Sequence, residues 1–281
     1  AQGAMISLIA AATRRINLPG IERFIRILHS PDFRSKSWIE GVIKYRKSFF
    51  IKIKTKSFIE WSVFFKGDYE PEAAIIFKKY VKKGDVSMDV GANVGVHSLI
   101  LSDLVGTSGR VYSFEPNPRL LGRLKENISI NFIKNIEAYG VGLSDAASKA
   151  ALYSMAEDCP NQDMSSLYQK HSSELTEKFF IEIETLDEFV SKNKIEKLDF
   201  IKIDTEGNDL RVMLGSNQTL EKFHPTIYFE YDKKGWGLAG TTIEEAKKFL
   251  ENKGYRLFRA RGDGLGNIGD FENIIAAYTP K

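Results

Sequence analysis

Residues 86–95 read Val86-Ser-Met-Asp-Val-Gly-Ala-Asn-Val-Gly95, and this stretch decides the fold. Val86–Val90, a short stretch that we interpret as a buried strand, leads into a turn with two glycines, Gly91 and Gly95, and a helical pattern follows. Glycine has no Cβ, so the backbone can approach a ligand closely there. The next helix presents the positive end of its dipole to the same place. The stretch therefore predicts a strand, a ligand-binding turn and a helix, as in open α/β sheets.

A second predicted strand, residues 110–114, is followed directly by Glu115. A carboxylate at that place can accept hydrogen bonds from both hydroxyls of a ribose. The glycine spacing differs from the G-x-G-x-x-G that admits a pyrophosphate, and Asp89 would repel a pyrophosphate but attract the ammonium of an amino acid. A ligand with a ribose at one end and an α-amino acid at the other is S-adenosylmethionine.

Strands and helices alternate from residue 85 onward, which predicts a mostly parallel sheet covered by helices on both faces. Strands are predicted at residues 86–90, 110–114, 136–143, 150–153, 180–184, 198–203, 226–231, 255–258 and 273–278. Helices are predicted at residues 72–83, 96–104, 118–131, 186–191, 210–223 and 243–252. Further upstream, residues 5–30 are predicted to be helical and residues 49–65 to form an antiparallel β-hairpin.

The chain is predicted to divide after residue 66. Residues 1–4 resemble a cloning scar, residues 5–66 form an N-terminal extension, and residues 67–281 form the main domain with a polar, turn-rich insertion at 156–178. The basic amphipathic pattern of residues 5–30 fits a helix on a membrane, but we favour packing on the main domain or on a second subunit. The extension is thus expected to cap the domain or to support a homo-oligomer.

Composition excludes several classes of protein. The chain of 281 residues has 40 basic and 37 acidic side chains, a net charge of +3 that is too balanced for an electrostatic nucleic-acid binder. The lone cysteine, Cys159, excludes an internal disulfide and a cysteine-based zinc site. No apolar stretch is long enough to span a bilayer. The N-terminal positive charges follow the apolar run, whereas in a secretory signal they precede it. We therefore expect a cytoplasmic protein without a nucleic-acid partner.

Carboxylates gather at the ends of two predicted strands. Asp204 and Glu206 follow the strand at 198–203, and Glu230 lies at the end of the next strand. Lys202 shares a face with Asp204 and, inside a central strand, needs a carboxylate partner. Such a cluster can take the proton of a substrate hydroxyl, or hold a divalent cation such as Mg²⁺.

Other polar residues near these strands have more ordinary explanations. We expect Asp209 and Asp232 to bind backbone amides or to cap helices. His97, in the first turn of the helix after the glycine turn, is expected to cover the edge of the cofactor. The chain has four histidines and no H-x-x-x-H pair, so a histidine metal site is not expected.

Three segments in this order resemble the FkbM family of S-adenosylmethionine-dependent methyltransferases: Asp89-Val-Gly-Ala-Asn-Val-Gly95, Phe114-Glu-Pro-Asn-Pro118 and Lys202-Ile-Asp-Thr-Glu-Gly207. The resemblance covers roughly residues 67–232, and Tyr69-Glu70 fits it as well. It implies a class I, Rossmann-like fold, a seven-stranded sheet whose last strand is antiparallel. It also implies methyl transfer to a hydroxyl of a sugar, glycan or polyketide-type natural product. Thr205 is a mild departure from the family's pattern.

The resemblance also implies roles for individual residues. The cofactor-binding residues would be Glu70, Asp89, Gly91, Ala92, Asn93, Gly95, Ser98, Glu115, Pro116, Asn117 and Asp204. The catalytic residues would be Asp204 and Glu206, with Lys202 beside them. Asp204 or Glu206 would accept the proton of the acceptor hydroxyl, and the alternative is a divalent ion held by Asp204 and Glu230.

Three other functions compete with this interpretation. A methyltransferase of the same fold that acts on RNA or on another nitrogen or oxygen acceptor is the first, but the two acids at 204 and 206 would repel a phosphate backbone. A nicotinamide oxidoreductase is disfavoured by the missing third glycine. A non-catalytic protein that keeps a vestigial fold would not bind the cofactor.

Two segments are candidates to cover the ligand-facing edge of the sheet. They are the extension at 5–66 and the insertion at 156–178, which holds short polar and aromatic groups suited to a hydroxyl-rich acceptor: Ser165, Ser166, Tyr168, Gln169 and His171. Because the insertion lacks apolar periodicity, we expect it to be mobile without substrate and ordered with it.

Overall fold

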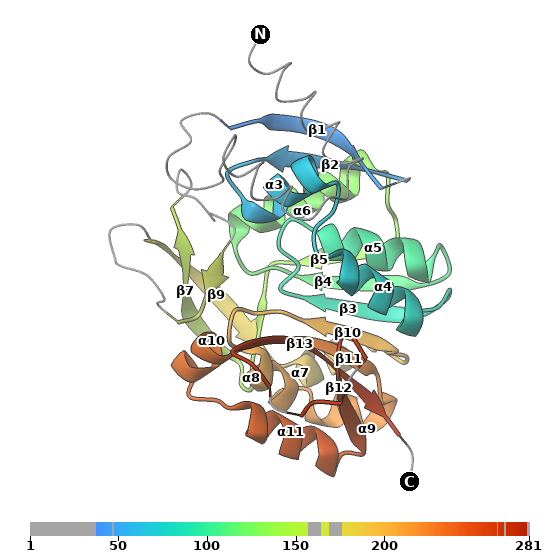
Figure 1. Cartoon of the computed structure of the whole chain (residues 1–281), viewed down its shortest axis with the longest axis vertical. Coiled ribbons are helices and arrows are strands. Elements are labelled where there is room, and N and C mark those ends of the chain that lie inside the picture. Colours follow the sequence, from blue (N-terminus) through green and yellow to red (C-terminus); the bar gives the residue numbers. More distant parts are fainter. Residues whose placement is uncertain are drawn as a thin grey trace.

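The computed structural model describes residues 38–46, 48–156, 164–168, 176–262, 264–266 and 268–279. The helical segment predicted at 5–30 and the residues before Met5 lie outside the described residues, as do Gln169 and His171. The described strands form a two-stranded, a seven-stranded and a four-stranded sheet (Figure 1).

The seven-stranded sheet is the centre of the fold. Its spatial order is β12 (Tyr255–Arg259), β13 (Phe271–Tyr278), β11 (Thr226–Asp232), β10 (Phe200–Ile203), β3 (Val86–Val90), β4 (Arg110–Phe114) and β5 (Ile136–Tyr139). The five strands from β11 to β5 pair in parallel, whereas β13 pairs antiparallel with both β11 and β12. This is a class I methyltransferase-like fold, and the antiparallel last strand is confirmed. The two antiparallel pairings make the sheet mixed.

Alternate residues along the central strands pack into two separate hydrophobic cores. On β11, Tyr228 enters one core, whereas Ile227 and Phe229 enter the other. On β10, Phe200 and Ile201 divide in the same way. A period of two with both faces apolar is what a sheet covered on both sides requires.

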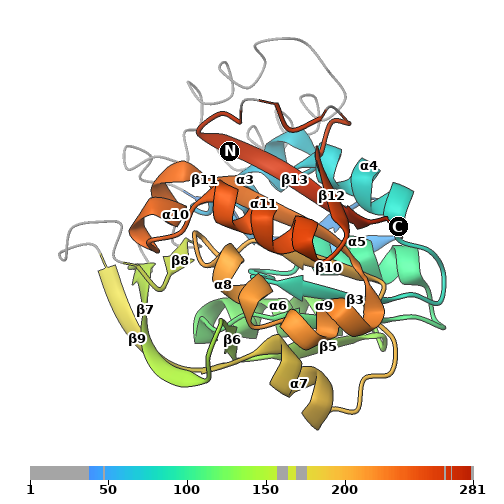
Figure 2. The same cartoon turned by 90° about the horizontal axis from the view of Figure 1, so that it is seen from below.

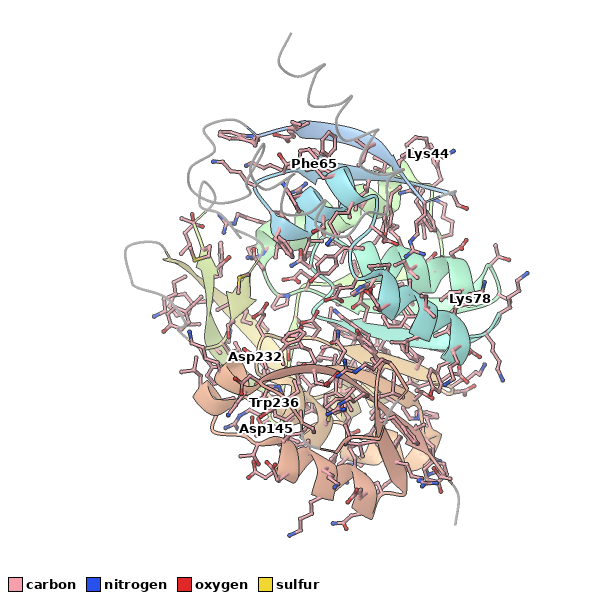
Figure 3. All side chains as sticks on the ribbon, viewed as in Figure 1. Lys44, Phe65, Lys78, Asp145, Asp232 and Trp236 are labelled. Atoms are coloured by element: carbon pink, nitrogen blue, oxygen red, sulfur yellow. The ribbon has the colours of Figure 1, made fainter. Side chains whose placement is uncertain are left out.

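Helices contribute to both cores (Figures 1 and 2). The core that contains Tyr228 includes residues of α3 (Phe58–Lys66), α4 (Pro71–Tyr80), α5 (Val96–Val105) and α6 (Pro118–Ile130). The other core includes residues of α7 (Leu186–Lys192), α8 (Asp209–Leu214), α9 (Asn217–Phe223), α10 (Lys233–Leu238) and α11 (Ile243–Asn252). Trp236 of α10 packs against β11 and donates from its Nε1 to the Glu230 carbonyl at 3.2 Å (Figure 3).

The hairpin predicted at 49–65 is wrong in its second half. Strand β2 (Phe49–Lys54) pairs antiparallel with the preceding strand β1 (Glu40–Tyr45), and the residues after β2 form helix α3. The Ser57 side chain caps α3 by accepting from the Glu60 amide. Trp61 and Phe65 then lie one turn apart in the core. Because Glu60 and Ser62 alternate with apolar residues in Ile59–Val63, the sequence of α3 imitates the period of two of a strand.

Other predicted boundaries also change. The helix predicted at 210–223 is two helices, α8 and α9, because the chain turns at Gly215, where a Cβ would lie 2.0 Å from the Ser144 carbonyl oxygen. The strand predicted at 136–143 is β5 and β6 (Gly142–Leu143), which belong to different sheets. Helix α10 was not predicted, and the helix predicted at 72–83 begins at Pro71 and ends at Tyr80.

A four-stranded sheet in the order β6-β9-β7-β8 lies beside the central sheet (Figure 2). Its main hairpin is formed by β7 (Ser148–Met155) and β9 (Thr176–Glu184), and β8 (Ser165–Ser166) pairs with the end of β7. Strand β8 and the start of β9 belong to the predicted insertion at 156–178. The part of the insertion that the structure describes is therefore ordered by strand pairing.

Candidate functional site

Two adjoining cavities lie where several parallel strands end. The inner cavity contains about 1000 Å³ of empty space, a figure that includes the open solvent at its mouth. Residues at the ends of β3, β4, β10 and β11, in the four-stranded sheet and in α3 line this cavity. They include Ile59, Tyr69, Gly91, Ala92, Asn93, His97, Glu115, Pro116, Ser165, Ser166, Leu167, Lys202, Asp204, Thr205, Glu206, Asn208 and Glu230. The outer cavity shares Tyr69, Glu206 and Glu230 with it.

The residues that the resemblance assigned to the cofactor divide into two groups. Those that line the inner cavity are Gly91, Ala92, Asn93, Glu115, Pro116 and Asp204. Those that stand behind its wall are Asp89, Gly95, Ser98 and Asn117, and Glu70 lines the outer cavity. Asn117 instead caps α6 and donates to the hydroxyls of Ser154 and Ser165, so it connects α6 to the four-stranded sheet.

The glycine turn packs against the protein itself. A Cβ on Gly91, whose φ is +77°, would lie 1.8 Å from the Asp204 carbonyl oxygen, and one on Gly95, with φ +92°, would lie 2.5 Å from the Leu124 side chain. The sequence predicts that both glycines make room for a ligand. Gly91 does line the inner cavity, but glycine is needed there because the Asp204 backbone lies so close. At Gly95 the left-handed φ of +92° is the reason, since the nearest atom is the end of the flexible Leu124 side chain.

Glu115 forms part of the wall after β4 and is only 4% exposed. One carboxylate oxygen accepts the Asn93 amide at 2.8 Å, and the other accepts the Asn117 amide at 2.9 Å. Burial raises the pKa of Glu115 to about 7, although these amide bonds lower it. Each oxygen keeps a second lone pair, so the carboxylate can still accept two hydroxyls from a ligand in the inner cavity.

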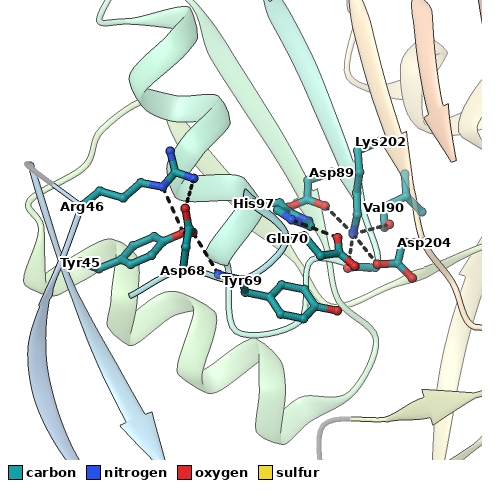
Figure 4. A network of polar contacts seen from close by, with 11 residues as sticks. Tyr45, Arg46, Asp68, Tyr69, Glu70, Asp89, Val90, His97, Lys202 and Asp204 are labelled. Carbon is teal, nitrogen blue, oxygen red and sulfur yellow. Dashed lines mark hydrogen bonds and ion pairs between the residues drawn. The ribbon is translucent and has the colours of Figure 1, made fainter. Parts of the chain in front are cut away.

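Lys202 holds the centre of a buried charge cluster (Figure 4). Its Nζ lies 3.1 Å from Asp89 Oδ1 and 3.4 Å from Asp204 Oδ2, and it donates to the Gly91 carbonyl at 2.8 Å. Burial lowers the pKa of Lys202, but the two carboxylates outweigh burial, and its pKa is raised overall. The predicted carboxylate partner of Lys202 is therefore confirmed, and there are two.

Asp89 does not have the position that its sequence suggested. Its side chain is fully buried, paired with Lys202, and accepts a 2.6 Å hydrogen bond from the Ser98 hydroxyl. The ammonium of an amino acid in the inner cavity would meet Asp204 instead, because Asp204 lines the cavity and Asp89 does not. Asp89 and Ser98 do not line the inner cavity, and their assignment to the cofactor stays a prediction.

Glu70 and His97 meet beside the Lys202 ammonium, on the side away from Asp204 (Figure 4). His97 Nε2 lies 3.5 Å from Glu70 Oε2, and the imidazole packs between the rings of Tyr69 and Phe77. Burial, followed by the charge of Lys202, lowers the pKa of His97 to about 4. Burial and the charge of Asp204 raise the pKa of Glu70 to about 7. His97 is therefore neutral at physiological pH and lines the inner cavity as an uncharged group.

The turn at residues 205–207 places Glu206 between the two cavities. The Asp209 carboxylate accepts from the amides of Thr205 and Gly207, both at 3.3 Å, so its expected role on backbone amides is confirmed. Gly207 has φ +103°, and a Cβ there would lie 2.6 Å from the Gly235 backbone of α10. The turn is thus held from both sides, and Glu206 has a fixed place on the cavity wall.

Glu230, at the end of β11, lines both cavities. Burial, and then the charges of Asp204 and Glu206, raise its pKa well above the ordinary value. Asp232, two residues further along β11, accepts from the Lys234 and Gly235 amides and caps α10, as expected.

Among the described residues, no group of three or more His, Cys, Asp or Glu side chains is arranged to hold a metal ion. Asp204 and Glu230 thus have no third ligand of these types there.

The described part of the insertion at 156–178 packs onto the turn at residues 205–207. The Ser166 hydroxyl donates to the Glu206 carbonyl at 3.0 Å, and the Tyr168 hydroxyl donates to the Asn208 side chain at 3.1 Å. Helix α3 reaches the same region, with Ile59 on the inner cavity and Ser62 on the outer one. Sequence reasoning missed the residues of α3, and the signal that could have found them is the capping serine Ser57 before an apolar stretch.

A family model of the FkbM methyltransferase domain matches residues 89–257, more than half of the chain. The chain belongs to the FkbM methyltransferase family. The matched range begins at Asp89, just before the glycine turn, and ends in β12. It therefore contains every segment that carried the resemblance in the sequence, apart from Tyr69-Glu70.

Two relatives of this FkbM chain have names that describe an activity. Over 160 residues it is 27% identical to the hexuronic acid methyltransferase AglP of Haloferax volcanii, covering 56% of this chain and 61% of that protein. Over 160 residues it is 26% identical to the 2-O-methyltransferase NoeI of Sinorhizobium fredii, covering 53% and 64%. The match thus spans less than two thirds of each relative.

A solved structure of an FkbM methyltransferase from Methylobacillus flagellatus aligns with a TM-score of 0.47 at 16% identity, covering 70% of this chain and 44% of that one. In the described ranges of this chain, no helix has the length and apolar character needed to cross a membrane.

Proposed function

We propose that this chain transfers the methyl group of S-adenosylmethionine to a hydroxyl of a sugar-like or glycan acceptor. The observation that carries the proposal is the placement of three carboxylates, Asp204, Glu206 and Glu230, on the inner cavity that Glu115 also lines. The names of the two relatives, a hexuronic acid methyltransferase and a 2-O-methyltransferase, agree with a sugar hydroxyl as the acceptor.

The residues of the inner cavity fit S-adenosylmethionine. Glu115 would accept the ribose hydroxyls, and Asp204 would face the ammonium of the methionine part. Neutral His97 and the apolar side chains of the wall would exclude water. When bound, the cofactor supplies a methyl group that its positive sulfur already activates, so the protein mainly aligns the reactants.

Glu206 is the better placed of the two predicted bases. It lines both cavities, where an acceptor hydroxyl and the methyl group would meet. Asp204 is instead engaged in an ion pair with Lys202 at 3.4 Å. Glu206 would accept the hydroxyl proton as the carbon–oxygen bond forms, and Glu230 would hold its own proton and donate a hydrogen bond to the acceptor.

Conservative variants of the carboxylates test this proposal. We expect Glu206→Gln or Asp204→Asn to lose most of the methyl transfer seen by mass spectrometry with a panel of sugars, glycans and macrolide-like alcohols. For Glu206→Gln, the melting temperature and the S-adenosylhomocysteine affinity should stay near wild type, because the shape of the side chain is kept. Asp204→Asn should in addition weaken S-adenosylhomocysteine binding, because Asp204 would face the ammonium of that ligand. The matched control is Glu126→Gln, an exposed residue paired with Lys52. Wild-type rates in both carboxylate variants would place the base elsewhere.

A further inference from the structure

The outer cavity lies next to the place where the methyl group would be transferred. It shares Tyr69, Glu206 and Glu230 with the inner cavity and extends along α3 to Phe58 and Ser62. An acceptor hydroxyl must approach the cofactor from a neighbouring space, and the outer cavity opens onto the carboxylates of the inner one.

Negative charge dominates the wall of the outer cavity. The acidic side chains that line it are Glu70, Glu72, Glu206, Glu230 and Asp232. Lys66 is the one lysine or arginine on this wall in the described part of the chain. Lys202 is held by Asp89 and Asp204 on the inner side, and among the acidic residues of the outer cavity its charge offsets Glu70. A positively charged ligand would therefore be attracted here, and an anionic one repelled.

Ser62 is an independent sign that this cavity accepts a hydrogen-bonding ligand. It lines the outer cavity, is 1% exposed, and its hydroxyl is buried without a hydrogen-bond partner in the described structure. Buried hydroxyls are normally satisfied, so a ligand hydroxyl or amine is the natural partner. Phe58, Tyr69 and Phe271 add aromatic surface, which packs against sugar rings and attracts cations.

We propose that the outer cavity is the acceptor subsite and that it selects a polyhydroxy acceptor carrying an ammonium group, such as an amino sugar, over neutral and uronate analogues. The inference rests on the proposed function and names its substrate class. An ammonium group would lie among these acidic side chains, of which Glu230 holds its proton, a sugar ring would pack on the aromatic side chains, and Ser62 would gain a partner. A uronate would bring a further negative charge beside Glu206.

Binding can be measured without turnover. The full chain is saturated with S-adenosylhomocysteine and titrated with the methyl glycosides of an amino sugar, its neutral parent and its uronate, each in the gluco, galacto and manno configurations. We expect the best amino sugar to bind at least tenfold more tightly than its uronate, with the neutral sugar between them. High salt should reduce this ratio, because the outer cavity is open to solvent.

Variants separate this selection from a structural effect. Glu72→Gln should reduce the amine-to-uronate ratio about threefold, whereas Glu251→Gln on α11 should leave the ratio unchanged. Ser62→Ala should weaken binding of all three sugars without lowering the melting temperature, because its hydroxyl makes no hydrogen bond in the described protein. A merely structural serine would instead change the melting temperature and not the affinity.

The outcomes are distinguishable from a failure of the proposed function. A uronate or neutral sugar that binds as tightly as the amino sugar overturns the inference, as does an amine-to-uronate ratio that Glu72→Gln leaves unchanged. So does S-adenosylhomocysteine binding with no binding of any amino sugar. If S-adenosylhomocysteine itself does not bind, the proposed function fails first.

Discussion

Glu115 holds the glycine turn in place and is also proposed to bind the cofactor. Both carboxylate oxygens already accept backbone amides, from Asn93 and Asn117, and thereby fix the glycine turn relative to β4. Burial raises the pKa of Glu115 to about 7. A ligand whose hydroxyls bond to the ionised carboxylate would favour that form and release a proton on binding when the pH is below 7.

From this we predict the pH dependence of cofactor binding. S-adenosylhomocysteine should bind more tightly at pH 8 than at pH 6, because Glu115 is largely protonated at the lower pH and ionised at the higher one. Glu115→Gln should weaken binding at pH 8 at least tenfold, since bonds to a charged acceptor are worth about 1.5–3 kcal/mol each. It should also flatten the pH dependence.

Calorimetry in buffers of different ionisation enthalpy measures both quantities. The melting temperature of Glu115→Gln serves as the control for its amide bonds. Equal affinity of the wild-type protein and the variant at pH 8 would show that Glu115 does not contact the ribose.

At the scale of elements, Lys202 joins two strands and the glycine turn. It extends from β10 to Asp89 on β3, to the Gly91 carbonyl and to Asp204, all within a buried region. Removal of one partner of a buried ion pair leaves an uncompensated charge, and this costs about 3–5 kcal/mol.

Lys202→Met should therefore lower the free energy of unfolding by about 3–5 kcal/mol in urea titrations. The double variant Lys202→Met/Asp89→Asn should recover part of the loss, because the fully buried Asp89 would no longer carry a charge. If the free energy of unfolding of Lys202→Met lies within about 1 kcal/mol of the wild-type value, water or a structural change compensates the charges of the two aspartates.

The contact between the insertion and the turn at 205–207 gives a second prediction at this scale. The Tyr168 hydroxyl donates to the side chain of Asn208, which lines the inner cavity, whereas Tyr168 itself does not. Tyr168→Phe removes this bond, which is worth about 0.5–1.5 kcal/mol. We expect a several-fold loss of kcat/KM with unchanged S-adenosylhomocysteine affinity, because the turn that carries Glu206 would be held less firmly.

Tyr153→Phe, on the neighbouring strand β7, is the matched control. Equal kcat/KM in both variants would show that the hydrogen bond between Tyr168 and Asn208 does not contribute to catalysis. The expected mobility of the whole insertion stays a prediction, since residues 157–163 and 169–175 lie outside the described ranges.

At the scale of the whole molecule, the residues before position 67 share a hydrophobic core with the central sheet. Ile51 of β2 and Trp61 and Phe65 of α3 belong to the same cluster as Phe200 and Tyr228. The predicted division after residue 66 remains a proposal, as do an oligomer formed through the extension and a cytoplasmic location.

A truncated chain of residues 67–281 tests the division directly. We expect it to lose cooperative unfolding, because it would expose the core face that Trp61 and its neighbours cover. As a milder change, Trp61→Ala should cost about 3–5 kcal/mol. A truncated chain that unfolds at the wild-type temperature would mean that residues 67–281 are an independent domain.

Most of the central strands and helices could be predicted from the sequence, because burial on both faces of a sheet leaves a local apolar pattern. Strands β3 and β4 and helix α11 match their predicted ranges. Helix α3 could not be predicted in this way, because the alternation of apolar residues with Glu60 and Ser62 imitates a strand, and both polar residues are buried in the folded protein. Its helical form depends on the Ser57 cap and on the core that surrounds it.

For the candidate site, the sequence determined which chemical groups end the central strands: a glycine turn, Glu115 and the carboxylates at 204, 206 and 230. Only the tertiary structure decided which of them face the cavity. Asp89 lies behind Lys202, and Gly91 is required by the Asp204 backbone. The physical reason is that local pattern records whether a residue is buried, whereas its partner is set by segments more than a hundred residues away.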